Sequence, residues 1–120
     1  MKIAIPIDKD EGLDSKIVNH FGRCLYFLIL DYDFNILDII TNDSIHHKGT
    51  MLPPEFLKSH QVTDILCHSL GPKALQRCKE LRIKVYLDPL SQKASEILEK
   101  YKKNILDEAD MNQTCKEHRK

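Results

Sequence analysis

Five short apolar runs, each about the length of a β-strand, are spread along most of the chain. Residues 2–7 and 26–30 are almost continuously apolar, which is typical of strands buried on both faces of a sheet. Similar runs at residues 36–41, 63–67 and 83–87 complete the predicted set of strands. Residues 31–35 are rich in turn formers, so the second and third strands are expected to form an antiparallel hairpin.

Helical segments are predicted from capping residues, prolines and apolar periodicity. The first helix is predicted to have Thr50 at its N-cap and two prolines in its first turn, and to run to about His60. The second is predicted to begin at Pro72. The third is predicted to be capped by Ser91 and to carry its apolar face as far as Ile105.

The order of these elements indicates an α/β fold with one mixed sheet. A helix between the third and fourth strands, and another between the fourth and fifth, imply parallel crossovers. The hairpin then makes the second strand the reversed one. We expect a single domain over residues 1–106, followed by a polar tail at 107–120 that is predicted to be disordered.

Composition narrows the classes of protein to which the chain can belong. Lys and Arg number 18 and Asp and Glu also number 18, so no overall charge favours nucleic acid as a partner. No apolar run approaches the roughly 18 residues of a membrane span, and the first residues do not resemble a signal peptide. A cytoplasmic protein that contacts no membrane is expected. The 4 cysteines are widely spaced, which favours free thiols or metal ligands over a disulfide framework.

The predicted strand directions bring several chemically active side chains to one edge of the sheet. The second strand begins at this edge and the other four end there, and the helix that starts at Pro72 points its free amides the same way. Ligands of open α/β sheets bind at the carboxyl ends of the strands. The candidate residues expected at this edge are His20, Arg23, Cys24, His46, His47, Cys67, His68 and Gly71.

This set of residues suits an anionic ligand that contains metal. Imidazole and thiolate groups bind iron, zinc, copper or an iron–sulfur unit, while Arg23 and the helix start would balance negative charge. Structural roles remain open for several of them. His20 could bond a backbone carbonyl, His46 and His47 could form a solvated turn, and Cys67 could simply end a buried strand.

Four further residues are assigned structural or peripheral roles. Cys78 lies in the apolar arc of the second helix and is predicted to be a small buried hydrophobe, and His60 near a helix end is predicted to be structural. Cys115 and His118 lie on the tail and would reach the candidate site only if the tail is extended.

The acidic loop at residues 8–14 lacks the ligand pattern of a calcium loop.

Motifs of the common enzyme classes are missing from the chain. It contains no nucleophile elbow, phosphate-binding loop or dinucleotide-binding fingerprint. A nucleophile pair of Cys24 and His20 is conceivable, but the short flexible loop that carries both residues disfavours it. The protein is therefore expected not to be an enzyme.

Several short motifs occur together in the register of one known family. They are Met1-Lys2-Ile3-Ala4-Ile5-Pro6, Gly12-Leu13-Asp14-Ser15, His20-Phe21-Gly22-Arg23, Tyr26-Phe27, Gly71-Pro72 with Ala74-Leu75, and Ile83-Lys84-Val85-Tyr86. On these motifs the chain resembles the dinitrogenase iron–molybdenum cofactor biosynthesis family, as a small stand-alone member, over about residues 1–105. The His-Phe-Gly-Arg block carries most of the resemblance.

The resemblance implies both a fold and a function. The implied fold is ribonuclease-H-like, with a five-stranded mixed sheet in the order 3-2-1-4-5, strand 2 antiparallel and about three flanking helices. The implied function is to bind or carry an iron–sulfur or iron–molybdenum cluster without turnover, with a donor or acceptor protein as partner. His20 carries over as a ligand and Arg23 as its charge partner. A monomer or weak homo-oligomer is expected.

Two rival functions are considered. A ribonuclease-like enzyme would need clustered carboxylates that hold two metal ions, but the predicted strands carry only Asp38 and Asp64. The other rival is a protein-interaction or small-anion-binding module that uses the same edge without metal. Uptake of iron would separate the cluster carrier from this module.

Overall fold

The computed structural model of the chain describes residues 2–19, 21–42 and 52–109. The strands are β1 (Lys2–Ile7), β2 (Tyr26–Leu30), β3 (Ile36–Thr41), β4 (Val62–Cys67) and β5 (Lys84–Leu87). The helices are α1 (Pro53–Ser59), α2 (Pro72–Glu80) and α3 (Ala94–Lys102), and two short 3-10 turns are η1 (Gly12–Asp14) and η2 (Phe21–Arg23).

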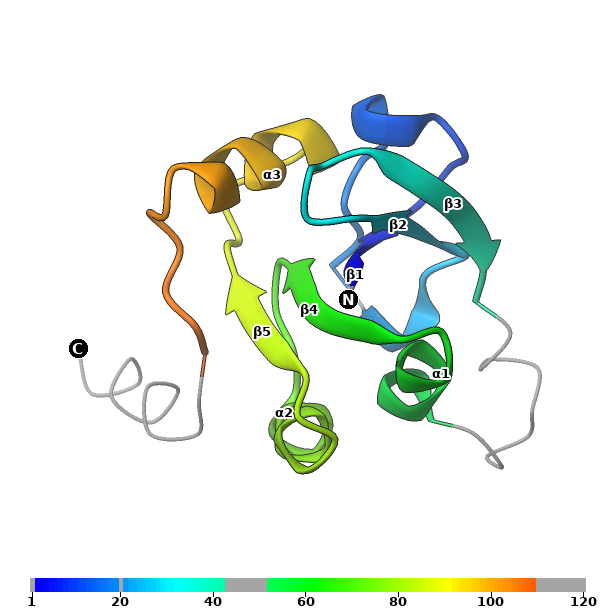
Figure 1. Cartoon of the computed structure of the whole chain (residues 1–120), viewed down its shortest axis with the longest axis vertical. Coiled ribbons are helices and arrows are strands. Elements are labelled where there is room, and N and C mark those ends of the chain that lie inside the picture. Colours follow the sequence, from blue (N-terminus) through cyan, green and yellow to red (C-terminus); the bar gives the residue numbers. More distant parts are fainter. Residues whose placement is uncertain (1, 20, 43–51, 110–120) are drawn as a thin grey trace.

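The strands form one mixed sheet in the order β3-β2-β1-β4-β5 (Figure 1). β2 is antiparallel to both of its neighbours, β1 and β3, while β4 is parallel to both β1 and β5. The predicted α/β class, strand order, reversed second strand and three helices are therefore confirmed.

The sheet is covered on both faces, which explains its apolar strands. Helices α1 and α2 pack on one face and α3 on the other (Figure 1). Successive residues of β2 alternate between the two sides: Phe27 and Ile29 join the core under α1 and α2, while Leu28 and Leu30 join the core under α3. A strand buried in this way has no position left for a polar side chain.

Two helix starts differ from the prediction. Leu52 occupies the N-cap of α1, and the predicted cap Thr50 lies outside the described residues. Ser91 does not cap α3, because its hydroxyl donates to the Asp88 carboxylate at 2.6 Å. The N-cap is Lys93, and the Glu96 carboxylate accepts its backbone N–H at 3.1 Å.

The carboxyl end of α3 also differs from the prediction. The helix ends at Lys102 and the chain turns at Asn104, which has a φ of 58°. Ile105 is consequently 62% exposed instead of lying on the apolar face of the helix. A left-handed residue of this kind is a common way to stop a helix, and asparagine tolerates it better than most residues.

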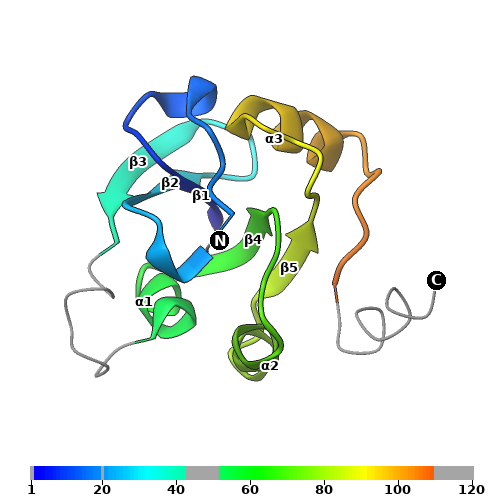
Figure 2. The same cartoon turned by 180° about the vertical axis from the view of Figure 1, so that it is seen from behind.

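Ordered structure continues beyond the predicted domain boundary at residue 106. The Ala109 N–H donates to the Val85 carbonyl at 2.7 Å, and Glu108 forms a bridge with Tyr86. The segment after α3 thus returns along β5 (Figures 1 and 2), and Ala109 is buried. Residues 108 and 109, at the start of the predicted tail, are therefore held against β5. The rest of the predicted tail, residues 110–120, is outside the described part of the chain.

The outermost strand on the side of the sheet away from β5 is β3, which pairs with β2 alone. Ile36 and Leu37 are 45% and 49% exposed, so this edge offers apolar surface to a second strand. Asp38 counters that tendency in two ways. It places a charge in the middle of the strand, and its carboxylate accepts the Ile39 N–H at 2.8 Å. Charged residues on an edge strand oppose edge-to-edge pairing.

We expect Asp38→Val to make the protein self-associate through β3. The change removes the charge that would meet its own copy in an antiparallel pair, and valine favours strands. Sedimentation velocity should show a larger, concentration-dependent sedimentation coefficient than that of the parent chain. Asp33→Val, in the turn before β3, is the matched control. Equal association of the two variants would remove the role given to the edge carboxylate.

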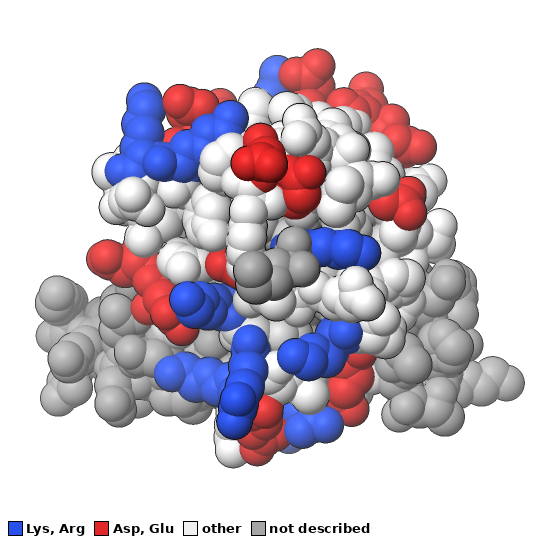
Figure 3. All heavy atoms as spheres, in the orientation of Figure 1, with Lys and Arg blue, Asp and Glu red and all other residues white. Residues whose placement is uncertain are grey.

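Charged side chains of both signs occur on the surface. On the face drawn in Figure 3, Lys and Arg side chains are frequent around α2 with Asp and Glu side chains among them, and further Asp and Glu side chains lie toward the upper right. Within the described ranges, no helix has the length and apolar character needed to cross a bilayer.

Candidate functional site

The described candidate segments come together at the edge where β1, β4 and β5 end. Ile7 at the end of β1 pairs with Tyr26 at the start of β2, and Tyr26 pairs with Thr41 at the end of β3. Helix α2 begins directly after β4. Figure 2 shows η2 and the loop that leads into α2 on the same side of the sheet. The convergence expected from strand direction is thus present for these segments.

A cavity of about 300 Å³ lies between these loops. Three parts of the chain form it: the segment around η2, the first residue of α1, and the loop and first turn of α2. The lining residues are Asn19, Phe21, Gly22, Arg23, Pro53, Ser69, Leu70, Gly71 and Ala74. Of the predicted site residues that the structure describes, Arg23 and Gly71 line this cavity.

The cavity lining combines cationic and polar groups with apolar surface. Arg23 is exposed and contributes a guanidinium, and Gly71 is the N-cap of α2, a helix of 9 residues. Free amides at a helix start favour negative charge. Phe21 and Leu70 supply apolar surface. This combination fits an anion that also presents a weakly hydrated surface.

The two lining glycines have different roles. A Cβ on Gly22 would lie 3.3 Å from Pro53 Cγ, so the backbone of η2 approaches α1 closely there. A Cβ on Gly71 would meet nothing within 4 Å. Gly71 is therefore not required for packing, and its backbone stays open on the cavity side.

Asn42 holds η2 from the end of β3. Its side-chain amide donates to the Gly22 carbonyl at 3.2 Å and to the Cys24 carbonyl at 2.9 Å, and the residue is fully buried. Sequence reasoning missed Asn42, because an asparagine just after a strand is the usual sign of a turn. Only the fold reveals that its partners lie 18 to 20 residues earlier.

Cys24 and Cys67 do not line the cavity. Both thiols are buried in the core under α1 and α2, together with Cys78. Burial raises the pKa of Cys24 to about 12 and also raises the pKa of Cys67. The placement expected for these two thiols at the ligand-binding edge is therefore corrected: both point into the core. For Cys67 the reason is strand periodicity. Cys67 lies two residues after Ile65 in β4 and shares its face, which points into the core.

His68 lies at the edge, but both of its ring nitrogens face oxygen atoms. Nδ1 is 2.7 Å from Asn19 Oδ1, and Nε2 contacts the Ser91 carbonyl oxygen. Its neighbour Ser69 donates its hydroxyl to the Asn19 carbonyl at 3.3 Å. The two residues after β4 therefore hold the segment that forms one wall of the cavity.

The remaining predicted ligands, His20, His46 and His47, lie outside the described residues. The chain neighbours of His20, Asn19 and Phe21, both line the cavity. Within the described part of the chain, no group of three or more His, Cys, Asp or Glu side chains is arranged to hold a metal ion. The described residues therefore fit the charge of an anionic cluster without completing a ligand set for it.

Comparison with known proteins assigns this chain to a family. A family model described as dinitrogenase iron-molybdenum cofactor matches residues 1–104. The chain belongs to this family. The resemblance read from the His-Phe-Gly-Arg block and its companion motifs is thereby confirmed.

A curated relative and several solved structures are similar to this chain. MJ0580 of Methanocaldococcus jannaschii, described as uncharacterized, is 32% identical over 92 residues, which cover 72% of this chain and 73% of the relative. The apo form of the orange protein from Desulfovibrio gigas is 19% identical with a TM-score of 0.76, over 90% of this chain and 92% of that one. A putative NifB protein from Thermotoga is 24% identical with a TM-score of 0.71, over 89% and 91% of the two chains. At these identities the structural likeness establishes the fold.

Proposed function

We propose that the protein binds an iron–sulfur or iron–molybdenum type cluster as cargo in the cavity beside η2, and carries it without turnover. The proposal is supported by membership of the dinitrogenase iron-molybdenum cofactor family and by a cavity that combines a cation, a helix start and apolar surface. The observation that supports the proposal most directly is the set of residues that line this cavity. A donor or acceptor protein is the partner that a carrier requires.

Arg23 is proposed to balance the negative charge of the cargo. Its side chain is exposed at the cavity, so it can turn toward a ligand without leaving a buried partner unpaired. The start of α2, whose N-cap Gly71 also lines the cavity, adds partial positive charge. A charge-assisted contact of this kind contributes about 1.5–3 kcal/mol.

We expect Arg23→Gln to weaken cluster binding about tenfold or more, because one charge-assisted contact is lost. The measurement is anaerobic reconstitution with iron and sulfide, followed by absorption spectroscopy and iron analysis. Lys79→Gln, an exposed position on α2 that is absent from the cavity lining, is the matched control. Equal binding by the two variants would contradict the role given to Arg23.

His20 remains the predicted metal ligand and is tested in the same assay. Its imidazole is a suitable ligand for iron, and its chain neighbours line the cavity. We expect His20→Ala to lose most cluster uptake while its unfolding midpoint in urea stays that of the parent chain. Unchanged uptake would remove His20 from the site, and failure of the parent chain to take up iron would overturn the carrier proposal itself.

The alternative is a module that binds a small anion without metal. It is favoured by the presence of Arg23 and the start of α2 in the cavity lining, since a cation and a helix start suit a small anion without any metal ligand. This module would take up no iron but would bind sulfate or phosphate with an Arg23-dependent affinity. Isothermal titration with sulfate separates it from the carrier.

The ribonuclease-like rival receives no support from the strand carboxylates. Asp64 in β4 is buried and accepts hydrogen bonds from three hydroxyl groups, while Asp38 lies on β3 and bonds its own strand. β1 and β2 separate β3 from β4 in the sheet, so these carboxylates are not neighbours. A two-metal site needs clustered carboxylates.

A further inference from the structure

We infer that His68 is a positioning residue, which fixes the cavity wall formed by Asn19 and η2, and that it is not a ligand of the cargo. The importance of this wall for cargo binding rests on the proposed function. We call the contacts of the His68 ring with Asn19 and Ser91 the clamp. The evidence for the clamp comes from the described residues alone.

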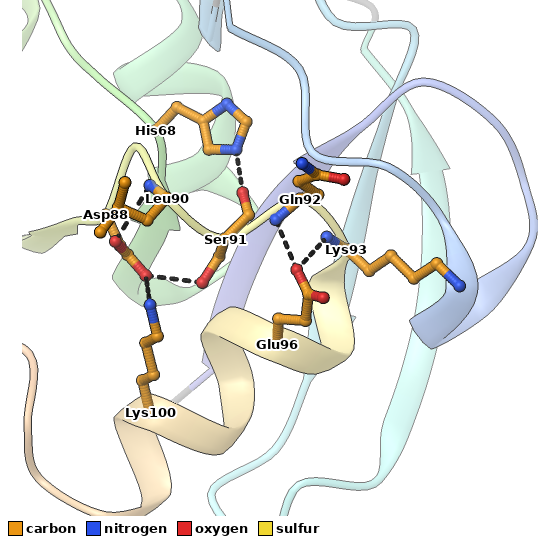
Figure 4. Close-up of polar contacts among 8 residues, drawn as sticks. All are labelled: His68, Asp88, Leu90, Ser91, Gln92, Lys93, Glu96 and Lys100. Carbon is orange, nitrogen blue, oxygen red and sulfur yellow. Dashed lines mark hydrogen bonds and ion pairs between the residues drawn. The ribbon is translucent and has the colours of Figure 1, made fainter.

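The imidazole of His68 joins three loops that are distant in the sequence. His68 follows β4, and its Nδ1 reaches Asn19 Oδ1 at 2.7 Å, in the segment that leads into η2. Its Nε2 bonds the backbone carbonyl of Ser91, in the loop between β5 and α3 (Figure 4). The partners lie 49 and 23 residues away in the chain.

Both ring nitrogens are occupied in either protonation state. The Ser91 carbonyl can only accept, so Nε2 of His68 carries a hydrogen. If the ring is neutral, Nδ1 accepts from the Asn19 side-chain NH2 group, with the positions of the amide nitrogen and oxygen exchanged. If the ring is protonated, Nδ1 donates to Asn19 Oδ1. Neither nitrogen therefore offers a lone pair to a metal in the cavity.

The Ser91 end of the clamp is anchored firmly. The Ser91 hydroxyl donates to Asp88 Oδ2 at 2.6 Å, and Lys100 Nζ on α3 lies 2.7 Å from the same oxygen (Figure 4). Burial tends to raise the pKa of the Asp88 carboxyl, but the bonds from Lys100, Ser91 and the Leu90 N–H hold it below its ordinary value. The carboxylate therefore stays ionised and keeps the loop attached to α3.

The Asn19 end is the part of the cavity wall that the clamp controls. Asn19 lines the cavity, and the Ser69 hydroxyl supports it by donating to its carbonyl at 3.3 Å. Upstream, the Ile17 N–H donates to the Gln92 carbonyl at 2.8 Å without any help from the imidazole. Loss of His68 should therefore loosen the wall locally and leave the rest of the long β1–β2 connection in place.

Hydrogen exchange of the protein without cargo tests the clamp directly. In His68→Ala, peptides that cover residues 18–25 should exchange about tenfold faster than in the parent chain, while those from β1 and β4 should not change. His68→Gln, whose amide can still donate to the Ser91 carbonyl, should fall between the two. His60→Ala is the matched control, because His60 packs on the Phe56 ring and is absent from the cavity lining. Unchanged exchange at 18–25, or a uniform increase over all peptides, would overturn the clamp.

Reconstitution with iron and sulfide distinguishes a positioning residue from a ligand. A positioning role predicts weaker cluster binding by His68→Ala with the absorption spectrum of the bound cluster unchanged, since the metal keeps its ligands. A changed spectrum with normal exchange at residues 18–25 would make His68 a ligand and overturn the inference. If the parent chain takes up no iron, the proposed cargo is wrong, and the exchange experiment still decides whether the clamp exists.

Discussion

Raising the pH above about 8.5 is expected to destabilise the protein steeply, because three thiols are buried in one core. Cys24, Cys67 and Cys78 are each at most 1% exposed. Burial raises the pKa of Cys24 and of Cys78 to about 12, and raises that of Cys67 as well. A thiol of the unfolded chain ionises near pH 8.5, so the unfolded state loses protons that the folded state retains.

The sign and size of the effect follow from proton linkage. Each thiol contributes stability that is fully present below its unfolded pKa and is lost as pH rises toward its folded pKa. The loss approaches roughly 1.4 kcal/mol per pH unit for each thiol, so the three together reach roughly 4 kcal/mol per pH unit. A domain of ordinary stability, about 5–15 kcal/mol, would then unfold within a few pH units.

Urea unfolding at a series of pH values checks this expectation. The free energy of unfolding should fall by roughly 4 kcal/mol per pH unit, which corresponds to the release of about three protons on unfolding. Cys78→Ala should reduce that slope by about one third. The pKa of Tyr101 is also raised, first by burial and then by Asp64, so a further decline is expected above about pH 10. A slope of one proton or less between pH 9 and pH 10 would show that the thiols are not buried as described.

Replacing Asp64 with alanine is expected to cost about 3 kcal/mol of stability. This carboxylate is 3% exposed in β4 and accepts three hydroxyl hydrogen bonds. Tyr32 donates to Oδ1 at 2.5 Å and Thr63 donates to the same oxygen at 2.8 Å, while Tyr101 donates to Oδ2 at 3.0 Å. The bonds tie the β2–β3 turn and α3 to the central part of the sheet.

The expected cost reflects the loss of an acceptor shared by several donors. Removing the carboxylate leaves the Tyr101 hydroxyl partly buried without its partner, whereas the more exposed Tyr32 can turn to water. Asp64→Asn should cost less, because its amide oxygen still accepts. The free energy of unfolding in urea measures both variants. If Asp64→Leu proved more stable than the parent, the burial cost of the charge would outweigh its three bonds.

The helix and strand pattern, the strand directions and the converging edge could be predicted from the residues themselves, and the strand order was implied by the family resemblance. Residues 26–30 are apolar enough to specify a buried strand, and the five residues after them specify the hairpin that reverses β2. Reversal of that strand brings η2 and the start of α2 to one side. Arg23 and Gly71 were therefore found at the cavity from local patterns and strand direction alone.

Contacts between distant segments could not be predicted in this way. The sequence placed Cys24 and Cys67 near the correct edge, but whether a side chain at a strand end points to the cavity or to the core depends on the register with neighbouring strands. Asn42, His68 and Asp64 each have at least one partner between 18 and 49 residues away. Local sequence carries no signal for such pairs.

The sequence by itself thus determined the elements, their directions and the edge that carries the cavity, because burial on two faces and short connections leave few alternatives. Only the tertiary structure decided which polar groups serve the cavity and which serve the fold. The physical reason is that a hydrogen bond needs its partner within about 3 Å, and packing of remote segments sets that distance. Two thiols, Cys24 and Cys67, and the imidazole of His68 had been candidate site residues, and their contacts assign the thiols to the core and the imidazole to the clamp.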